Sequence, residues 1–259
     1  MSESLLCKKQ NGVAILTLNR PKAYNSFNRE MALALIAKFE DFAVDDEVRA
    51  IVLTGIGAAF CAGQDLKEVT EDNGITFEII LREHYNPIIK AIRTIRKPVI
   101  AAINGVAAGA GANIAFCCDL TIAKESATFT QAFSKIGLVP DSGGTFFLPR
   151  LVGMQRATAM MMLSNKITAK EAAEIGLIYH CVNDEEFDSA VMKLAEKIAR
   201  MPTKALGMTK ELINAGFNNN LEDQLKMEGD YQISASKSHD YNEGVNAFLE
   251  KRRPDFIGK

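Results

Sequence analysis

Residues 98–118 read PVIAAINGVAAGAGANIAFCC, and they predict a strand and a helix joined by a loop. PVIAAING (98–105) is short, apolar on both faces and ends at glycine, which is typical of a buried parallel strand. GVAAG (105–109) is predicted as the loop. ANIAFCC (112–118) has helical spacing, so residues 109–111 should open a helix. Strand, loop and helix in this order indicate an α/β protein.

The residues before this segment predict further strands and helices. Residues 5–19 read as two strands joined by an Asn-Gly turn, and AIVLTG (50–55) reads as another buried strand. Asn28 is placed to cap the helix that follows it. A long helical stretch (75–96) contains Pro87, which should bend or split it.

After about residue 153 the chain is predicted to be helical almost throughout, with one strand at LIYHCVN (177–183). We therefore divide the chain into an α/β core, residues 1–200, and a helical region, residues 201–259. The helical region has several apolar stripes, so it must pack on the body or on another subunit.

Composition excludes several classes of protein. Thirty basic and 32 acidic residues give a net charge of −2, and no basic run suggests a nucleic-acid partner. No apolar stretch reaches the roughly 18 residues of a membrane span, and the first residues lack the features of a signal peptide. Five cysteines without a Cys/His cluster predict reduced thiols, no metal site and a cytoplasmic protein.

Two glycine-containing turns are candidates for a binding site. The first amides of a helix that begins at residues 109–111 have no intrahelical partner, and small side chains let a ligand approach them. A second turn, Ala62 to Gln64, follows a buried strand. One amide from each turn, directed at one oxygen, would form an oxyanion hole. The alternative is that these glycines only permit close packing, and neither stretch fits a dinucleotide-binding fingerprint.

Asp141 stands in GLVPDSGGT (137–145), between an apolar run and two glycines. An acid there is either a turn former, as Pro-Asp-x-Gly often is, or a chemical group. The residues alone leave both interpretations open. A serine nucleophile at Ser142 is not favoured, because no histidine stands in a supporting motif.

Five segments together resemble the enoyl-CoA hydratase/isomerase, or crotonase, superfamily. They stand in its order and spacing: NRPKAYNSFN (19–28), AFCAGQDL (59–66), KPVIAAINGVAAGAG (97–111), IGLVPDSGGTFFLPRLVG (136–153) and EGVNAFLEKRRPDF (243–256). The resemblance implies a spiral of ββα units, coenzyme A thioester substrates bound by the core, and a helical C-terminal region that forms trimers or pairs of trimers. It implies no cofactor besides the coenzyme A of the substrate.

The resemblance also implies residue roles. The amides of Gln64 and Ala110 would form the oxyanion hole, and Ala110 departs from the glycine of many members. Substrate and coenzyme A would lie along Lys22, Ala23, Tyr24, Ala62, Asp65, Leu66, Gly109, Phe133, Phe248 and Lys251.

Asn113 and Phe133 occupy the two positions where hydratases of the superfamily have glutamate. Neither can activate water. Asp141 occupies a position where its isomerases have an acid and its hydratases usually have glycine. AFSKIGLVPDSGGT (132–145) and the C-terminal residues resemble in particular the ring-1,2-epoxyphenylacetyl-CoA isomerases of phenylacetate breakdown.

The resemblance thus implies an acyl-CoA isomerase that acts through a thioester enolate, with Asp141 as its acid/base. It would shift a double bond or rearrange the 1,2-epoxide of phenylacetyl-CoA to an oxepin. Apolar neighbours (Phe133, Leu138, Val139) are expected to raise the pKa of Asp141. Two alternatives remain: an atypical enoyl-CoA hydratase, and a non-catalytic relative that binds coenzyme A or RNA.

Overall fold

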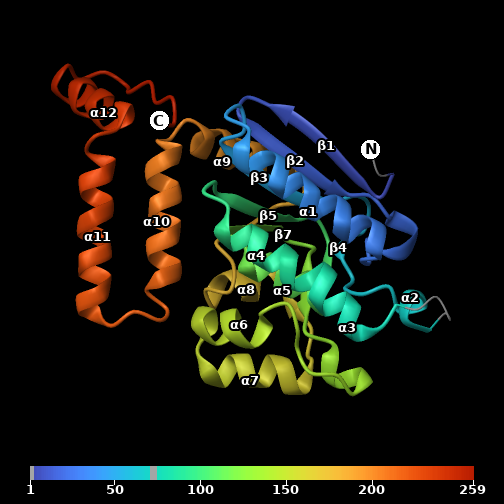
Figure 1. Ribbon diagram of the computed structural model, residues 1–259. Coiled ribbons are helices and arrows are strands. Elements are labelled where there is room, and N and C mark those ends of the chain that lie inside the picture. The colour runs from blue at the N-terminus through green and yellow to red at the C-terminus, as the bar shows by residue number, and fades with distance from the viewer. Residues whose placement is uncertain (1–2, 71–74) are drawn as a thin grey trace.

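The computed structural model describes residues 3–70 and 75–259, and two sheets organise them (Figure 1). The larger sheet has the order β1-β2-β3-β5-β7-β10, and the smaller has the order β4-β6-β8-β9. β1 pairs antiparallel with β2 and β9 with β8, and the other pairs are parallel. The strands are β1 (Leu5–Gln10), β2 (Val13–Leu18), β3 (Ala50–Gly55), β4 (Ala59–Cys61), β5 (Val99–Ile103), β6 (Val106–Ala108), β7 (Leu120–Lys124), β8 (Thr128–Thr130), β9 (Ile167–Thr168) and β10 (His180–Val182).

The chain passes from the larger sheet to the smaller sheet and then into helices three times. β3 leads to β4 and then to α2–α4, β5 leads to β6 and α5, and β7 leads to β8, η3 and α6. This succession confirms the α/β class and the spiral of ββα units expected from the sequence.

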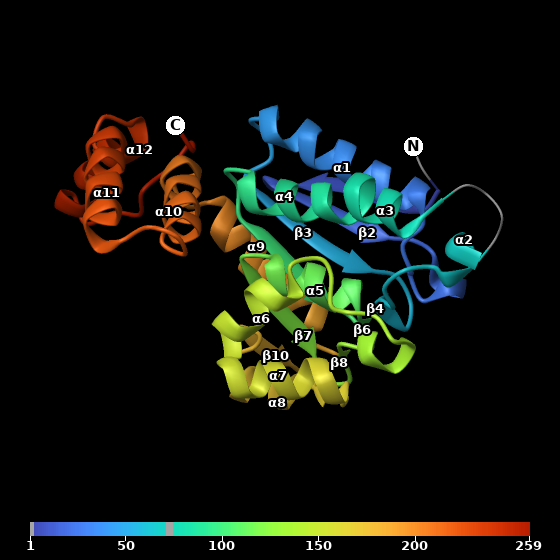
Figure 2. The same cartoon turned by 60° about the horizontal axis from the view of Figure 1, so that its bottom comes forward.

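The helices cover the larger sheet on both faces (Figure 2). The helices of the described chain are η1 (Pro21–Ala23), α1 (Arg29–Val44), α2 (Leu66–Thr70), α3 (Phe77–Ile79), the π-helical η2 (Ile80–Tyr85), α4 (Asn86–Thr94), α5 (Ala110–Cys117), η3 (Phe133–Ile136), α6 (Gly144–Val152), α7 (Met154–Leu163), α8 (Ala169–Glu174), α9 (Phe187–Ala199), α10 (Thr203–Ala215), α11 (Leu221–Ala235) and α12 (His239–Leu249). Alternate strand residues divide the core into two parts: Leu53 and Ala101 face the side of α1, whereas Val52 and Ile100 pack with α9.

Local signals in the sequence are confirmed where they are strong. Asn11 and Gly12 both have positive φ, 52° and 75°, as the turn between two antiparallel strands requires. The side chain of Asn28 accepts a hydrogen bond from the amide of Met31 at 3.0 Å and caps α1. The helix does not end near Pro87 but changes there from π-helical to α-helical hydrogen bonding.

Two predictions of secondary structure are wrong. The predicted loop 105–109 contains β6, which pairs with β4 and β8. The part of the chain after residue 153 contains a further strand, β9, which pairs with Phe129 and Thr128 of β8. Strands of two or three residues are too short to show a periodic pattern, and only pairing with neighbours defines them.

Residues 201–259 form an arm of three helices, α10, α11 and α12, that projects from one side of the core in both views (Figures 1 and 2). Arg49 of the core holds the base of the arm: its guanidinium donates to Thr203 Oγ1 at 2.9 Å and to the Phe256 carbonyl at 2.6 Å. Lys210 of α10 pairs with Asp119 of the core at 2.7 Å. In the parts of the chain that the structure describes, no helix combines the length and the apolarity needed to cross a lipid bilayer.

Candidate active site

Two loops expected at the site lie side by side. The Ala62 amide donates to the Tyr24 carbonyl at 3.0 Å, and the Phe27 amide donates to the Gly63 carbonyl at 2.7 Å. The Asp65 amide then donates to the Phe27 carbonyl at 2.9 Å. This short ladder joins residues 20–28 to residues 61–66, and it brings together six of the predicted coenzyme A contacts: Lys22, Ala23, Tyr24, Ala62, Asp65 and Leu66.

The start of α5 packs directly against the second of these loops. A Cβ at Gly111 would lie 2.4 Å from the Cys61 carbonyl oxygen, so only glycine permits this approach. A Cβ at Gly63 would lie 3.6 Å from the Ala110 amide nitrogen. The small residues therefore serve close packing, and the same packing brings the Gln64 loop next to the N-terminus of α5.

The backbone amides of Gln64 and Ala110 have no acceptor in the described chain. Within residues 3–70 and 75–259, neither amide donates a hydrogen bond to the chain itself. Ala110 is the first residue of α5, so its N–H has no intrahelical partner and lies at the positive end of the helix dipole. Two such donors on adjacent loops suit an oxygen that gains negative charge.

The Gln64 side chain belongs to a partly buried hydrogen-bond network. Tyr85, at the end of η2, donates from its hydroxyl to Gln64 Oε1 at 2.9 Å. Gln64 Nε2 donates to Glu68 Oε2 at 2.9 Å, and Glu68 Oε1 accepts from the Arg29 amide at 2.7 Å. Burial and the nearby charges of Cys61, Asp141 and Glu68 raise the pKa of Tyr85, so the hydroxyl stays a donor.

Asp141 lies in a tight turn before α6. Ser142 and Gly143 have positive φ, 50° and 72°, and the Gly144 amide donates back to the Asp141 carbonyl at 2.9 Å. Asn113 of α5 donates to the same carbonyl at 2.9 Å. The turn interpretation of Asp141 is thus correct for its backbone.

The carboxyl group of Asp141 has a second property. Burial raises its pKa to about 6, although the Ser142 hydroxyl donates to it at 2.9 Å and opposes the rise. The rise agrees with the expectation from sequence, but Val139 does not account for it, because that side chain is 81% exposed. A carboxyl with this pKa exchanges protons near neutral pH.

Phe133 and Gly109 lie together beside the start of α5. Gly109 has φ of 52°, and a Cβ there would lie 3.8 Å from the Phe133 ring. Asp65 has its carboxylate occupied, because it pairs with Arg20 at 2.7 Å and accepts from the Lys67 amide. The side chains of Lys22 and Leu66 are exposed.

The single chain does not bring Phe248 and Lys251 to the other predicted contacts. Phe248 belongs to α12, which lies at the opposite end of the molecule from α2 in both views (Figures 1 and 2). Its side chain is 82% exposed. Their role in binding coenzyme A stays a prediction.

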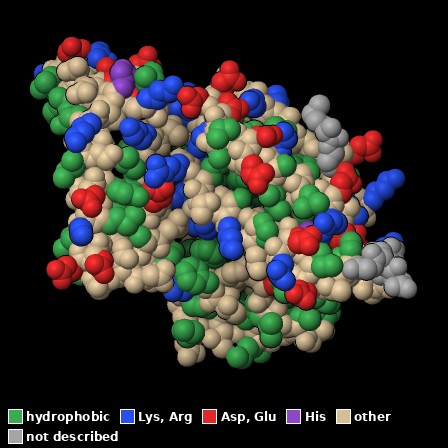
Figure 3. Space-filling model, in the orientation of Figure 1, with side chains coloured by type: hydrophobic (Ala, Val, Ile, Leu, Met, Phe, Trp, Pro, Cys, Tyr) green, Lys and Arg blue, Asp and Glu red, His purple; other side chains and the backbone are tan. Residues whose placement is uncertain are grey.

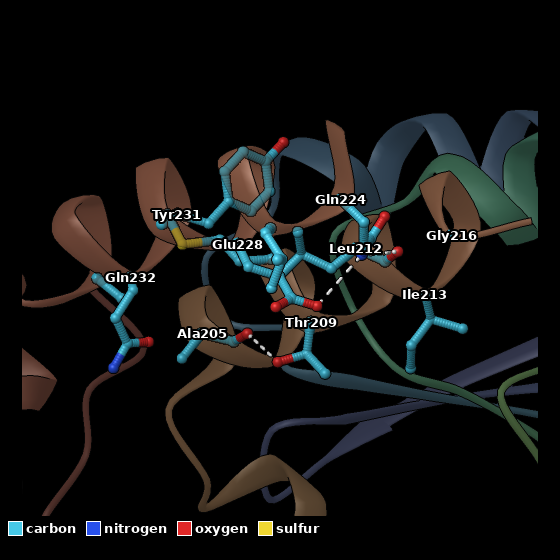
Figure 4. A pocket seen from close by; sticks show the side chains of 13 residues that line it. Ala205, Thr209, Leu212, Ile213, Gly216, Gln224, Glu228, Tyr231 and Gln232 are labelled. Carbon is cyan, nitrogen blue, oxygen red and sulfur yellow. Dashed lines mark hydrogen bonds between the residues drawn. The ribbon is translucent and has the colours of Figure 1, made fainter. Parts of the chain in front are cut away.

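A cavity of about 740 Å³ lies on the arm, away from Asp141. Leu212 and Ile213 of α10 and Gln224 and Glu228 of α11 line it (Figure 4). Gln224 Nε2 donates to the Leu212 carbonyl at 3.1 Å and joins the two helices beside the cavity. None of the residues that line it belongs to the predicted site.

Comparison with known proteins places the chain in a family. Residues 8–259 match the model of the enoyl-CoA hydratase/isomerase family. The chain belongs to the enoyl-CoA hydratase/isomerase family. It is 45% identical to the 1,2-epoxyphenylacetyl-CoA isomerase of Escherichia coli, with all of both chains covered. It is 47% identical to a probable enoyl-CoA hydratase of Rhodobacter capsulatus, over 96% of this chain and 95% of the relative.

Solved structures of the enoyl-CoA hydratase/isomerase family share the fold. A putative enoyl-CoA hydratase/isomerase from Mycobacterium abscessus superposes with a TM-score of 0.93 at 37% identity, covering 98% of this chain and all of the other. The family resemblance and the fold predicted from it are therefore confirmed. Relatives with isomerase names and relatives with hydratase names are both similar, so the reaction must be argued from the site itself.

Sequence reasoning missed three residues that the structure places at this site: Tyr85, Gln131 and Arg20. Tyr85 was part of a helical stretch with no visible signal of its own. Gln131 follows β8, a strand too short to be predicted. Both Tyr85 and Gln131 are buried, but neither stands in an apolar run, so no pattern in the sequence indicated that burial.

Proposed function

We propose that the chain is an acyl-CoA isomerase that acts through a thioester enolate, with Asp141 as its single acid/base. The observation that carries this proposal is the pKa of Asp141, raised to about 6, on a loop hydrogen-bonded to the helix that begins at Ala110. A carboxyl with a pKa near the working pH can both accept and return a proton.

The proposed reaction has two proton transfers. The amides of Gln64 and Ala110 polarise the thioester carbonyl, and the Asp141 carboxylate removes a proton from the α-carbon. The electron pair of that C–H bond moves into the carbonyl, and the two amides stabilise the enolate oxygen. Protonated Asp141 then returns the proton two carbons away, which moves the double bond from the β,γ to the α,β position. The scheme needs no metal, flavin or nicotinamide.

Two further residues support isomerisation over hydration. Asn113 and Phe133 stand where hydratases of the family have glutamate, and both are buried. Hydration needs a base for water and an acid for the α-carbon. An amide and a phenyl ring supply neither.

The similarity to the Escherichia coli isomerase favours 1,2-epoxyphenylacetyl-CoA as the substrate. Protonated Asp141, placed near the epoxide oxygen, would assist the rearrangement to the seven-membered oxepin. Ile136 and Leu138, just before Asp141 in the chain, are 56% and 38% exposed. This apolar surface suits an apolar acyl group.

An enoyl-CoA hydratase is the second candidate, because the Rhodobacter capsulatus relative bears that name. Product analysis separates the candidates. The purified protein is incubated separately with crotonyl-CoA, a matched 3-enoyl-CoA and 1,2-epoxyphenylacetyl-CoA. We expect products of unchanged mass from the last two, and hydration of crotonyl-CoA at a rate at least about 100-fold lower. Comparable rates of hydration and isomerisation would contradict the proposal. If the protein has no catalytic activity, none of the three thioesters will be converted.

We also propose that the arm assembles the chain into a homotrimer or a pair of trimers. Leu221, Leu225 and Ile233 of α11 are 74%, 57% and 58% exposed. In the face shown in Figure 3, hydrophobic side chains lie along the arm and where it meets the core. In an assembly of this kind, α12 could carry Phe248 and Lys251 to the site of a neighbouring subunit.

A further inference from the structure

Two buried amide side chains lie between α5 and the Asp141 turn. Asn113 and Gln131 are 0% and 1% exposed. Asn113 Nδ2 donates to the Asp141 carbonyl at 2.9 Å, and Gln131 Nε2 donates to Asn113 Oδ1 at 2.8 Å. The three residues form a chain of hydrogen bonds with one direction.

The backbone carbonyl of Asp141 fixes the direction of these hydrogen bonds. A backbone carbonyl only accepts, so Asn113 must turn its NH₂ group toward Asp141. Its oxygen then faces Gln131, which must turn its own NH₂ group toward Asn113. Gln131 Oε1 is consequently left over, and it is the one buried side-chain polar atom in the described residues without a hydrogen-bond partner.

Folding stability does not explain this arrangement. A buried acceptor without a partner is destabilising, and two apolar side chains of similar size would fill the same space without that cost. What the amides provide is a donor directed at the back of the Asp141 turn. Asn113 also packs on that turn directly, because a Cβ at Gly144 would lie 2.4 Å from its Nδ2.

Asn113 lies on the same helix as the Ala110 amide. α5 begins at Ala110, whose amide is proposed to hold the enolate oxygen, and Asn113 lies one turn further along the same helix. A rigid helix therefore connects the oxyanion hole to the backbone of the proposed base.

We propose that Asn113, oriented by Gln131, is a positioning residue that fixes Asp141 relative to the oxyanion hole. This inference rests on the proposed role of Asp141 as the acid/base. At this position the family's hydratases have a carboxylate to use on water, whereas here an amide donates to the backbone of the loop that carries the Asp141 carboxylate.

The test is Asn113→Leu, which removes the donor and keeps the number and branching of the side-chain heavy atoms. We expect kcat for isomerisation to fall about tenfold or more, with KM within about twofold, because misplacement of a base impairs the transition state more than binding. A released turn also lets the carboxyl reach water. The acid limb of the rate–pH profile should then move from about pH 6 toward 3.8.

Two further variants test the inference if Asn113→Leu does not fold. Gln131→Met keeps the bond from Asn113 to Asp141 but removes its support, and the double variant Asn113→Leu/Gln131→Met makes the whole pair apolar. Both should show the lowered acid limb while melting near the parent's temperature. The control is Asn214→Leu in α10 of the arm, which removes an asparagine amide that donates to the Arg93 carbonyl of α4 at 2.9 Å and whose oxygen accepts from the Arg93 guanidinium. It should leave the pH profile unchanged.

The inference is overturned if the folded Asn113 and Gln131 variants keep the parent's kcat and acid limb. Measurements on Asp141→Asn distinguish this from failure of the proposed function. An inactive Asp141→Asn with a normal Asn113→Leu profile overturns the positioning role alone. An active Asp141→Asn overturns the acid/base role and this inference with it.

Discussion

The hydroxyl of Tyr85 lies 2.9 Å from Oε1 of Gln64 and donates a hydrogen bond to it. The π-helical turn that ends at Tyr85 directs this buried phenol at the loop whose backbone amide is proposed to bind the thioester oxygen. The phenol is 1% exposed and packs edge-on against Phe27, with ring centroids 5.8 Å apart. Tyr85 therefore holds Gln64 from the side away from solvent.

Tyr85→Phe should lower kcat about tenfold while KM changes little. The ring still fills the core, but the Gln64 loop loses the bond that orients it, and one donor of an oxyanion hole contributes at most about 100- to 1,000-fold. Steady-state kinetics with a 3-enoyl-CoA measure the effect. Tyr231→Phe is the matched control, because it removes a 2.8 Å bond to Glu211 on the arm. An unchanged kcat in Tyr85→Phe would show that the loop needs no such support.

Asp141→Asn should lower the isomerase rate by at least about 100-fold, which is the low end of a general acid/base contribution. Asparagine keeps the volume and the turn, but it cannot accept and return a proton. Binding of the coenzyme A thioester should stay near the parent's value, and exchange of the substrate's acidic C–H with solvent deuterium should fall together with turnover. Near-normal turnover would leave Asp141 with only its backbone role.

The rate should depend on pH through Asp141. The base is active as the carboxylate, and its pKa is raised to about 6. We therefore expect kcat/KM to level off above about pH 6 and to fall about tenfold for each pH unit below it. A profile that stays flat down to pH 4.5 would mean that the base has an ordinary aspartate pKa.

The same pKa predicts a change of stability in the variant. Folding raises the pKa of Asp141 from 3.8 to about 6, so the folded state binds this proton more tightly than the unfolded state. The parent therefore loses stability as the pH rises from about 4 to 6, by up to about 3 kcal/mol. Asp141→Asn removes the charge, and it should melt at a higher temperature than the parent at pH 7.5 and at a similar temperature at pH 4. Equal melting at both values would contradict the raised pKa.

Light scattering should give three or six times the 28.3 kDa mass of one chain at micromolar concentration. Leu225 lies on α11 with 57% of its surface exposed, and Leu225→Asp should shift the protein toward smaller species because a charge is excluded from an apolar interface. Lys226→Asp, a charge change at the neighbouring position, serves as the comparison. A monomeric parent would remove the basis for assembly through the arm.

The sequence by itself determined what short-range chemistry and ordered motifs can specify. The Asn11-Gly12 turn, the Asn28 cap and the buried strand at 99–103 follow from local preferences. The five ordered motifs predicted the family. Because Asn113 and Phe133 stand where hydratases have two glutamates, the sequence also predicted Asp141 as the acid/base of the reaction.

Only the tertiary structure decided the relationships that join distant parts of the chain. β6 and β9 exist because neighbouring strands pair with them, and no periodicity within two or three residues could predict that. The bond from Tyr85 to Gln64 and the chain from Gln131 through Asn113 to Asp141 connect residues up to 28 positions apart. The pKa of Asp141 likewise depends on burial, which is a property of the packed molecule and not of any one residue's neighbours in sequence.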